Sequence, residues 1–585
     1  MLRIAGRPIA GRALEGLNDE ESLCLSGWAL TMELDRWFRQ IDLRRWFGQV
    51  DLLFYLCAFV IVASLTLGGG ARNGRLSDAL LQLLAIPLLL VALWRLFEVP
   101  LTKQVRMVLV FCLAIAALPL VQLIPLPPWL WTALPNREVS AEAFHILGHK
   151  VPWMPISVSP HATWLSFLSL LVPLGVFIGT LLLGYRERRW LSLVILAVGV
   201  LSAFLGLLQV AQGPGSSLRF YYPGDAEAVG FFANRDHFAA LLYCVFLFSV
   251  AWAVQKATGV SRNRERHKYD TASVMALVGA FTVVVILLAG EAMTRSRAGI
   301  GLTMVALCAA FALGFSRQRF GGGRTFNKLL FGAVALVMIF SAQFALYRIG
   351  ERFNDPLQGT RPIFARTTLA AASAYMPLGS GLGTFVPVYG LFQKPEDTVD
   401  DAYVNRAHND PFELWLEAGV LGLALMGLFA FWLVRRSVEI WWSSPAEGAN
   451  DLDWSLARAA TIVVALLLAH SLVDFPLRTG AMMAVMAFAC AFLCEPLVRT
   501  EGRAGRAIEA ASKRAPHRDT RPKPAVRVGR TSTRRLAEPS DVPSVPPDQR
   551  WGTDMSWPKE WSQPSKPHSA GSESKPPNAS KPRKD

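Results

Sequence analysis

Long hydrophobic runs separated by short polar connections dominate the chain from about residue 50 to residue 497. A helix needs about 20 mostly apolar residues to cross roughly 30 Å of hydrocarbon, and runs of this kind occur about twelve times. They lie near residues 50–69, 78–98, 105–126, 164–184, 190–212, 230–254, 272–291, 298–316, 328–346, 411–434, 457–474 and 479–497. The pattern predicts an all-α polytopic membrane domain over residues 50–497, with one long polar loop at 347–410.

The short connections divide by charge into two groups. The basic ones would share one face with the N-terminus and lie at 185–189, 256–268, 317–328 and 435–436. Lys and Arg resist translocation, so this face is predicted to be cytoplasmic. The connections at 69–78, 127–163, 213–228 and 291–297, together with the loop 347–410, then lie on the opposite, periplasmic face. An even number of spans returns the C-terminus to the cytoplasm.

Both ends of the chain differ from the membrane domain. Residues 1–49 contain no early apolar run, so no cleaved signal peptide is predicted. Within them, residues 35–47 alternate Trp and Phe with Arg, which suits either an interfacial helix or an ordinary linker. Residues 498–585 are rich in Pro, Ser, Gly, Lys and Arg and poor in aliphatic residues. They are predicted to form a disordered, basic cytoplasmic tail, because they cannot bury enough apolar surface to fold.

Composition supports the membrane class. The chain has 585 residues, of which 52% are hydrophobic and only 18% charged, and its mean hydropathy is +0.33. The net charge of +15 is concentrated in the tail and the basic connections, so it does not predict nucleic-acid binding. The spacing of the seven cysteines fits neither a disulfide framework nor a metal site. Nucleotide-binding motifs are absent, and no metal or other cofactor is predicted.

Polar residues gather beside span ends on the predicted periplasmic face. They occur in FFANRDHFAALL (231–242), in TRSRAGIG (294–301) and in the long loop. The planar fork of arginine binds phosphate oxygens in pairs, so the arginines at positions 295, 297, 361 and 366 suit a diphosphate at the membrane surface. His408 can accept a proton from a hydroxyl nucleophile. Together these residues predict group transfer from an activated lipid.

Simpler roles are also open to these residues. Arginines beside span ends commonly extend to lipid headgroups. In AHNDPFELW (407–415), either Asn409 or Asp410 can cap the helix that begins near Pro411. Such a cap would also hold His408 rigidly at the entrance of the helix.

The order of these motifs resembles the O-antigen ligase/polymerase family of bacterial inner-membrane glycosyltransferases. The motifs read SRAG (296–299), Arg361, PLGSGLGTF (377–385), AHND (407–410) and EAGVLG (417–422). The resemblance is strongest over residues 228–435. It implies about twelve spans in an arrangement similar to the GT-C class, a location in the inner membrane with both termini cytoplasmic, and catalysis without a metal or nucleotide.

The resemblance also implies roles for individual residues. His408 matches the proposed catalytic base, while Arg361 and Arg297 match the arginines that grip the diphosphate of an undecaprenyl-diphosphate-linked glycan. The further residues assigned to substrate binding are Arg295, Arg366, Asn234, Asn409 and Asp410. Two positions depart from the family pattern, with Phe364 where Trp is frequent and Pro411 where Tyr is common, which leaves the contacts with the acceptor open.

The expected function is glycan transfer from undecaprenyl diphosphate to a hydroxyl of a lipid A core sugar or a growing polysaccharide. The same chemistry serves a repeat-unit polymerase or a protein O-oligosaccharyltransferase. A transporter of lipid-linked glycans is the non-enzymatic alternative. Its signature would be charges at mid-span and inverted repeats, whereas the ionisable groups here gather at one face.

Overall fold

The computed structural model describes residues 51–70, 76–221, 226–265, 271–315, 360–397, 404–443 and 449–497. All of them belong to the first of two compact units, Met1–Ser512. Several predicted features lie outside these residues. They are the N-terminal segment with its interfacial helix, the span at 328–346, the stretches 347–359 and 398–403 of the polar loop, and the tail at 498–585.

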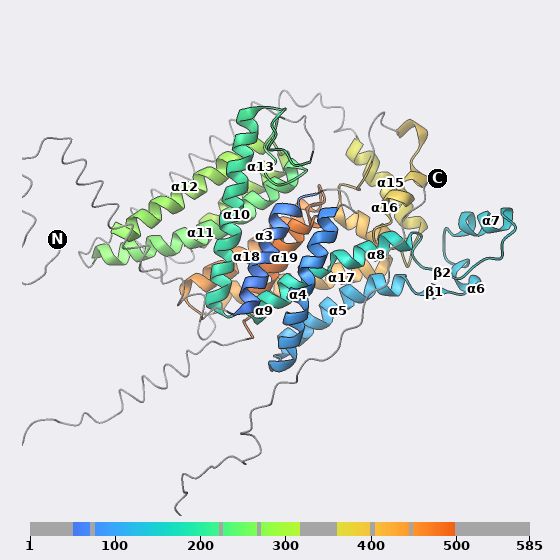
Figure 1. The fold of residues 1–585 in the computed structure, drawn as a ribbon, viewed down its shortest axis with the longest axis horizontal. Helices are drawn as coiled ribbons and strands as arrows, with labels where there is room; N and C mark the ends of the chain where they lie inside the picture. Colours follow the sequence, from blue (N-terminus) through green and yellow to red (C-terminus); the bar gives the residue numbers. More distant parts are fainter. Residues whose placement is uncertain are drawn as a thin grey trace, which may run out of the picture. The chain divides into compact units, whose positions relative to one another are not determined.

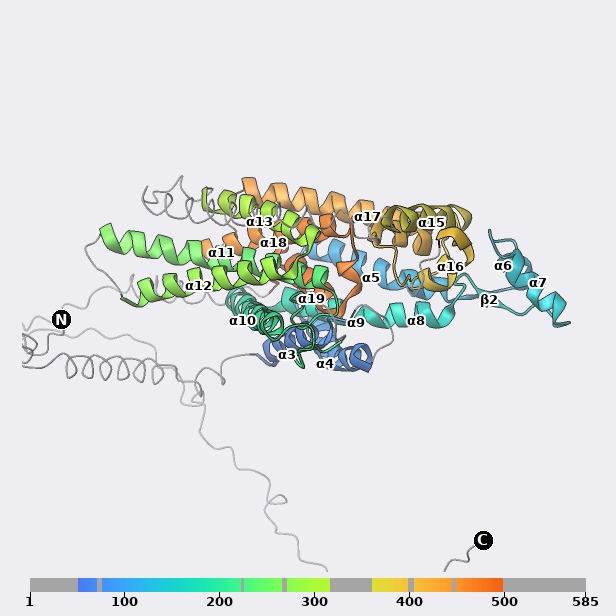
Figure 2. The same ribbon diagram turned by 90° about the horizontal axis from the view of Figure 1, so that it is seen from above.

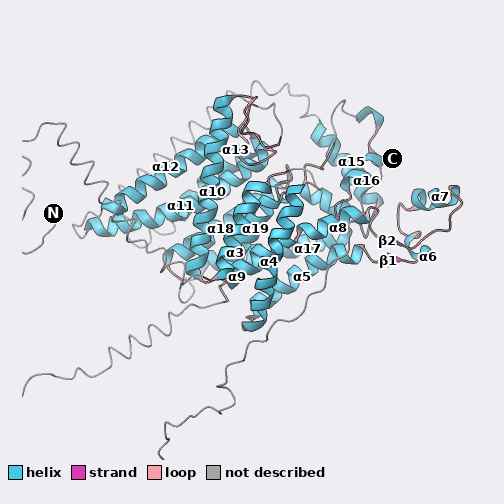
Figure 3. Ribbon diagram, in the orientation of Figure 1, coloured by secondary structure: helices cyan, strands magenta, loops and turns pink. Residues whose placement is uncertain are grey.

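Helices make up most of the described part of the chain (Figure 3). Its helices are α3 (Leu52–Leu67), α4 (Leu76–Glu98), α5 (Lys103–Gln122), α6 (Pro128–Trp131), α7 (Glu138–Ile146), α8 (Pro160–Ser169), α9 (Leu171–Leu182), α10 (Tyr185–Gln212), α11 (Arg235–Glu265), α12 (Thr271–Thr294), α13 (Arg297–Phe315), α15 (Thr360–Ala374), α16 (Phe385–Phe392), α17 (Asp410–Trp442), α18 (Asp451–His470) and α19 (Gly480–Phe492). The 3₁₀ turns are η3 (Pro395–Asp397) and η4 (Pro476–Arg478). The strands β1 (Pro125–Leu126) and β2 (Met154–Pro155) pair antiparallel, with Pro125 opposite Pro155.

Eight helical segments in the described residues are long and apolar enough to cross a membrane. They are α4, α5, the α8–α9 run, α10, α11, α12, α17 and α18, while the shorter apolar helices α3, α13 and α19 coincide with further predicted spans. The prediction of an all-helical, multi-pass membrane protein is therefore confirmed for the described part of the chain. The number of about twelve spans and the GT-C-like arrangement stay predictions.

Helix α11 lies side by side with α12 (Figures 1 and 2) and also contacts α10, α13 and α18. Glycines bring neighbouring helices close together. A Cβ atom added to Gly199 of α10 would lie 2.6 Å from a methyl of Val245 on α11, and one added to Gly179 of α9 would lie 2.6 Å from the sulfur of Cys57 on α3. Between lipid-embedded helices, such close packing replaces the hydrophobic effect as the main source of association.

Connections that the charge pattern assigns to one face do meet at one end of the bundle. The Ala233 N–H donates to Gly69 O at 2.9 Å, and the Ala228 N–H donates to Met293 O at 3.0 Å. Helices α15 and α16 and the start of α17 lie at this end as well (Figure 1). We call it the site end. Beyond it, the segment between α5 and α8 folds into β1, α6, α7 and β2 and is held by Arg137, whose guanidinium lies 5.4 Å from the centre of the Tyr375 ring.

The opposite end of the bundle is closed by one buried arginine, Arg188, at the start of α10. Its guanidinium donates to carbonyl oxygens at the ends of α9 and α19, at distances of 2.8–3.2 Å, those of Thr180, Leu181, Leu183, Ala491 and Cys494. The last carbonyls of a helix have no partner within it and carry partial negative charge. Arg188 therefore satisfies two helix ends with a single side chain.

Candidate functional site

The glycine-rich segment 377–385 docks against a break in helix α17. The break is at Gly419, where φ is 56° and ψ is −145°. The Gly381 N–H donates to the carbonyl of Glu417 at 2.9 Å. Gly379 has φ of 79°, and a Cβ atom there would lie 2.6 Å from the same carbonyl oxygen. The segment therefore needs glycines because its backbone packs directly on the backbone of a broken helix.

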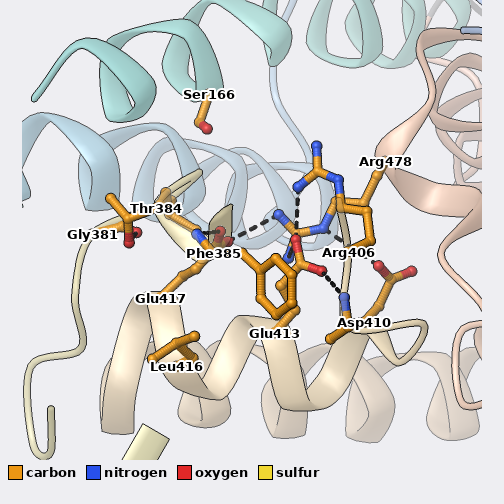
Figure 4. Close-up of polar contacts among 12 residues, drawn as sticks. Ser166, Gly381, Thr384, Phe385, Arg406, Asp410, Glu413, Leu416, Glu417 and Arg478 are labelled. Carbon is orange, nitrogen blue, oxygen red and sulfur yellow. Dashed lines mark hydrogen bonds and ion pairs between the residues drawn. The ribbon is translucent and has the colours of Figure 1, made fainter. Parts of the chain in front are cut away.

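A network of buried charges lies along the first two turns of α17 (Figure 4). Arg478 of η4 contacts three carboxylates: Glu417 at 2.9 Å, Asp410 at 3.3 Å and Glu413 at 3.6 Å. Arg406, in the loop before α17, lies 2.7 Å from Glu413. The side chains of Glu413 and Glu417 are fully buried. The network thus ties together the loop before α17, the start of α17 and the turn that follows α18.

The electrostatic balance of this network depends on Arg478. Burial alone lowers the pKa of its guanidinium, but the carboxylates of Glu413, Glu417 and Asp410 raise that pKa well above its ordinary value. Arg478 therefore stays charged at every pH at which the protein folds. Without it, three carboxylates in a low-dielectric region would lose their shared partner.

Next to this network, His408 and Asp474 form a hydrogen-bonded pair. His408 Nδ1 lies 2.8 Å from Asp474 Oδ1, across 66 positions of sequence. The Asp474 side chain is fully buried, whereas that of His408 is 25% exposed. Burial raises the pKa of the Asp474 carboxyl, but the hydrogen bond from His408 and the nearby imidazoles of His237 and His470 outweigh burial and hold that pKa below its usual range. A carboxylate on Nδ1–H leaves Nε2 of His408 as a proton acceptor.

Backbone geometry and aromatic rings hold His408 in place. Its φ of 50° is unusual for a residue other than glycine. Phe475 presents its edge to the imidazole at a centroid distance of 4.9 Å, and Phe364 stacks on it at 6.1 Å. Asn409 caps α17 by accepting from Phe412 N–H at 3.0 Å. The predicted cap is therefore confirmed, with Asn409 as the capping residue.

Two predicted arginines project from α15 and are paired with acids. Arg361 lies 3.7 Å from Asp236 at the start of α11 and donates to the carbonyl of Val473 at 3.2 Å. Its side chain remains 48% exposed. Arg366 lies 3.4 Å from Asp397. Arg361 thus reaches the same turn of chain that contains Asp474.

The remaining predicted residues surround this centre. Arg295, with φ of 53°, and Arg297, the first residue of α13, lie at the junction of α12 and α13. This junction packs on α11, because a Cβ atom at Gly299 would lie 2.4 Å from that of Ala239. Asn234 accepts from the backbone of Asp236 and caps α11. The structure therefore gathers His408, Asn409, Asp410 and Arg361 around the turn at 471–475, and places Arg295, Arg297 and Asn234 at the neighbouring ends of α11, α12 and α13.

Asp474, Arg478 and His237 are among the residues of the site that the sequence interpretation missed. A signal for the first two was present. Between Ala459 and Cys494 the basic and acidic residues are His470, Asp474 and Arg478, spaced four apart in a mostly apolar stretch. Ionisable residues so placed near the membrane mark functional or structural charge pairs.

One known protein family matches part of this chain. Residues 282–427 match the O-antigen ligase family model. Over this segment the chain is similar to O-antigen ligases. No curated protein matches the chain significantly. The segment matched to the ligase family contains Arg361 and His408 and ends before Asp474.

The match to this family indicates glycan transfer of the ligase or polymerase type within a membrane. Among the described residues, no group of three or more His, Cys, Asp and Glu side chains is arranged to hold a metal ion. The chemistry that this part of the molecule can offer is that of a half-open imidazole backed by a carboxylate, with arginines close by.

Proposed function

We propose that the protein transfers a glycan from undecaprenyl diphosphate to an acceptor hydroxyl at the periplasmic face of the bacterial inner membrane. The observation that carries this proposal is the His408–Asp474 pair, which leaves one imidazole nitrogen available at the same end of the bundle as four arginines. The match to the ligase family supports the class of reaction.

In the proposed reaction, His408 is the general base. Asp474 accepts the Nδ1 proton and holds the ring, so Nε2 receives the proton of the acceptor hydroxyl as its oxygen attacks the anomeric carbon. As the new glycosidic bond forms, the bond from that carbon to the diphosphate oxygen breaks, and its electron pair leaves with the undecaprenyl diphosphate. A single displacement of this kind inverts the anomeric centre.

The arginines stabilise the leaving group. Negative charge grows on the diphosphate in the transition state, and fixed guanidinium groups lower the barrier most when they are aimed at that charge. Arg361 and Arg297 are assigned this role, with Arg295, Arg366 and Asn234 at the edges of the donor site. Asn409 and Asp410 contribute through the capped start of α17, where both also contact the 471–478 turn.

The identity of the acceptor determines whether the protein acts as a ligase or as another glycan transferase that uses the same chemistry. A hydroxyl of a lipid A core sugar makes the protein a ligase, and the end of another lipid-linked repeat makes it a polymerase. The exposed Arg361 and half-open His408 suit any of these acceptors.

The proposal is tested with purified protein in detergent, a lipid-diphosphate-linked glycan and a panel of acceptors. We expect glycan transfer with at least one acceptor, together with release of undecaprenyl diphosphate. Arg361→Ala and Arg297→Ala should each lower kcat by about 10²-fold, as loss of a transition-state donor typically does. Arg95→Ala, in α4, is the matched control. Binding of the donor without turnover under any acceptor would favour a transporter instead.

A further inference from the structure

A second histidine lies on the far side of Asp474. His237 is in the first turn of α11, and its Nε2 is 3.5 Å from Asp474 Oδ2, while Oδ1 of the same carboxylate is 2.8 Å from His408. The His237 and Asp474 side chains are both fully buried. One carboxylate therefore lies between two imidazoles, of which that of His408 is partly exposed to solvent and that of His237 is buried.

Packing alone does not explain a histidine at position 237. Among the described residues, both ring nitrogens of His237 and the Oδ2 atom of Asp474 are buried without a hydrogen-bond partner. A buried polar ring without partners costs free energy, and a phenylalanine or leucine would fill similar space without that cost. The polar atom that His237 faces is the free oxygen of Asp474.

One aromatic ring connects the two imidazoles. Phe475 presents its edge to His237 at a centroid distance of 4.8 Å and to His408 at 4.9 Å. Phe475 directly follows Asp474 in the chain, so the ring that contacts both imidazoles is next to the carboxylate between them. The three side chains form one packed unit.

We propose that His237 is a positioning residue for glycan transfer, holding Asp474 Oδ2 so that Oδ1 fixes the ring of His408 with Nε2 toward the acceptor. With its ring proton on Nε2, His237 is the donor and the carboxylate is the acceptor. A small approach brings the 3.5 Å contact into hydrogen-bond range. This inference rests on the proposed function for the role of His408.

The other titratable and charged groups near His237 come from each of the elements around it. Asp236 precedes it on α11 and pairs with Arg361 of α15. His470, at the end of α18, lies 3.1 Å from the hydroxyl of Tyr243 through its Nδ1. His470 is thus engaged on α11, which leaves His237 as the imidazole beside the second oxygen of Asp474.

Two substitutions separate a polar role from a packing role. His237→Phe keeps an aromatic ring against Phe475 but removes the donor, and we expect kcat to fall by about 10-fold to 10²-fold, the scale of a misplaced catalytic group. The KM for the donor lipid should stay near the wild-type value. His237→Gln keeps an N–H donor near the Nε2 position and should recover most of the lost rate. His161→Phe, at an exposed position of α8, is the matched control.

Chemical modification of His408 gives a second measurement that does not depend on turnover. Diethylpyrocarbonate modifies neutral imidazole, so the pH dependence of its reaction with the His408 peptide, followed by mass spectrometry, reports the protonation of His408. In His237→Phe the Asp474 carboxylate loses its second imidazole neighbour, and the midpoint should differ from that of the wild type. In His237→Gln it should stay near wild type.

The outcomes distinguish this inference from the proposed function. A shifted midpoint in His237→Phe with no transfer by the wild type would support the coupling of the two histidines and reject the transferase. Transfer by the wild type, with rate and midpoint unchanged in His237→Phe, would reject the role of His237. A Phe variant that outperforms the Gln variant would do the same, because it would indicate packing rather than donation.

Discussion

Arg188, at one end of the helix bundle, and Arg478, at the site end, bind different kinds of partner. Arg188 binds backbone carbonyls of α9 and α19, whereas Arg478 binds three carboxylates along α17. A guanidinium on helix carbonyls completes hydrogen bonds that the helices lack. A guanidinium among carboxylates holds charged side chains in a region where each alone would be unstable.

The two ends of the bundle therefore differ in which groups their arginine holds in place. At the Arg188 end, the residue satisfies backbone groups. At the site end, the Arg478 network fixes the start of α17 and the turn at 471–478, the two segments that carry His408 and Asp474. The charges of this network thus hold the segments that carry the partly exposed His408 and its partner Asp474.

Among the residues around His408, the largest effect on activity is expected from Asp474→Asn. An amide at this position can donate to Nδ1 instead of accepting from it, which favours the wrong tautomer of His408, so kcat should fall by about 10²-fold or more. Donor binding should be nearly unchanged. Steady-state kinetics of the reconstituted protein check this, and a wild-type kcat would show that the carboxylate is not part of the catalytic pair.

Replacing each arginine with methionine tests whether Arg478 and Arg188 have different roles. Arg478→Met leaves three carboxylates without their common partner and should destabilise the protein by about 3–5 kcal/mol, the usual result of breaking a buried ion pair. Arg188→Met should also lower the midpoint of thermal unfolding, because it orphans helix carbonyls.

Activity per folded molecule separates these two variants. The Arg188 variant should retain the wild-type value below its unfolding temperature, since its defect lies at the other end. The Arg478 variant should lose most of its activity even where it stays folded. Equal specific activities in the two would contradict the division between stability and chemistry.

The stability of the folded protein at low pH should depend on the Asp474 carboxyl. Since the pKa of Asp474 is lowered in the folded protein, this carboxyl adds stability above its unfolded pKa of about 3.9. That stability is lost as the pH falls below this value. We therefore expect the stability of the wild type to drop more steeply than that of Asp474→Asn below about pH 4, with parallel curves above pH 5. Thermal melts across this range provide the measurement.

The smallest effect is expected from Asp236→Asn. In the structure Asp236 pairs with Arg361 at 3.7 Å, and a diphosphate would compete for the same guanidinium. Removing this competitor should lower the KM for the donor about two- to fivefold, in line with a partly exposed ion pair. Lys394→Gln, at an exposed loop position, serves as the control, and an increased KM for Asp236→Asn would show that Asp236 assists donor binding.

The membrane architecture was predictable because each span carries its own signal. An apolar run such as that of α10 must be helical in lipid whatever its neighbours are. The break at Gly419 was not predictable in this way, because it depends on the glycine-rich segment that docks on it. Likewise, His408 was singled out by its local motif, but its partner lies 66 positions away. Residues such as His237 become visible only when α11 is packed against the turn at 471–475.

In the proposed reaction, His408 takes the acceptor proton during transfer of a glycan from undecaprenyl diphosphate. The most direct measurement is a single-turnover assay in liposomes, with wild type and His408→Ala each given donor lipid with and without acceptor. We predict acceptor-dependent release of undecaprenyl diphosphate by the wild type, and a rate about 10²- to 10⁴-fold lower for a folded His408→Ala that binds the donor normally. Equal rates in the two proteins would contradict the account.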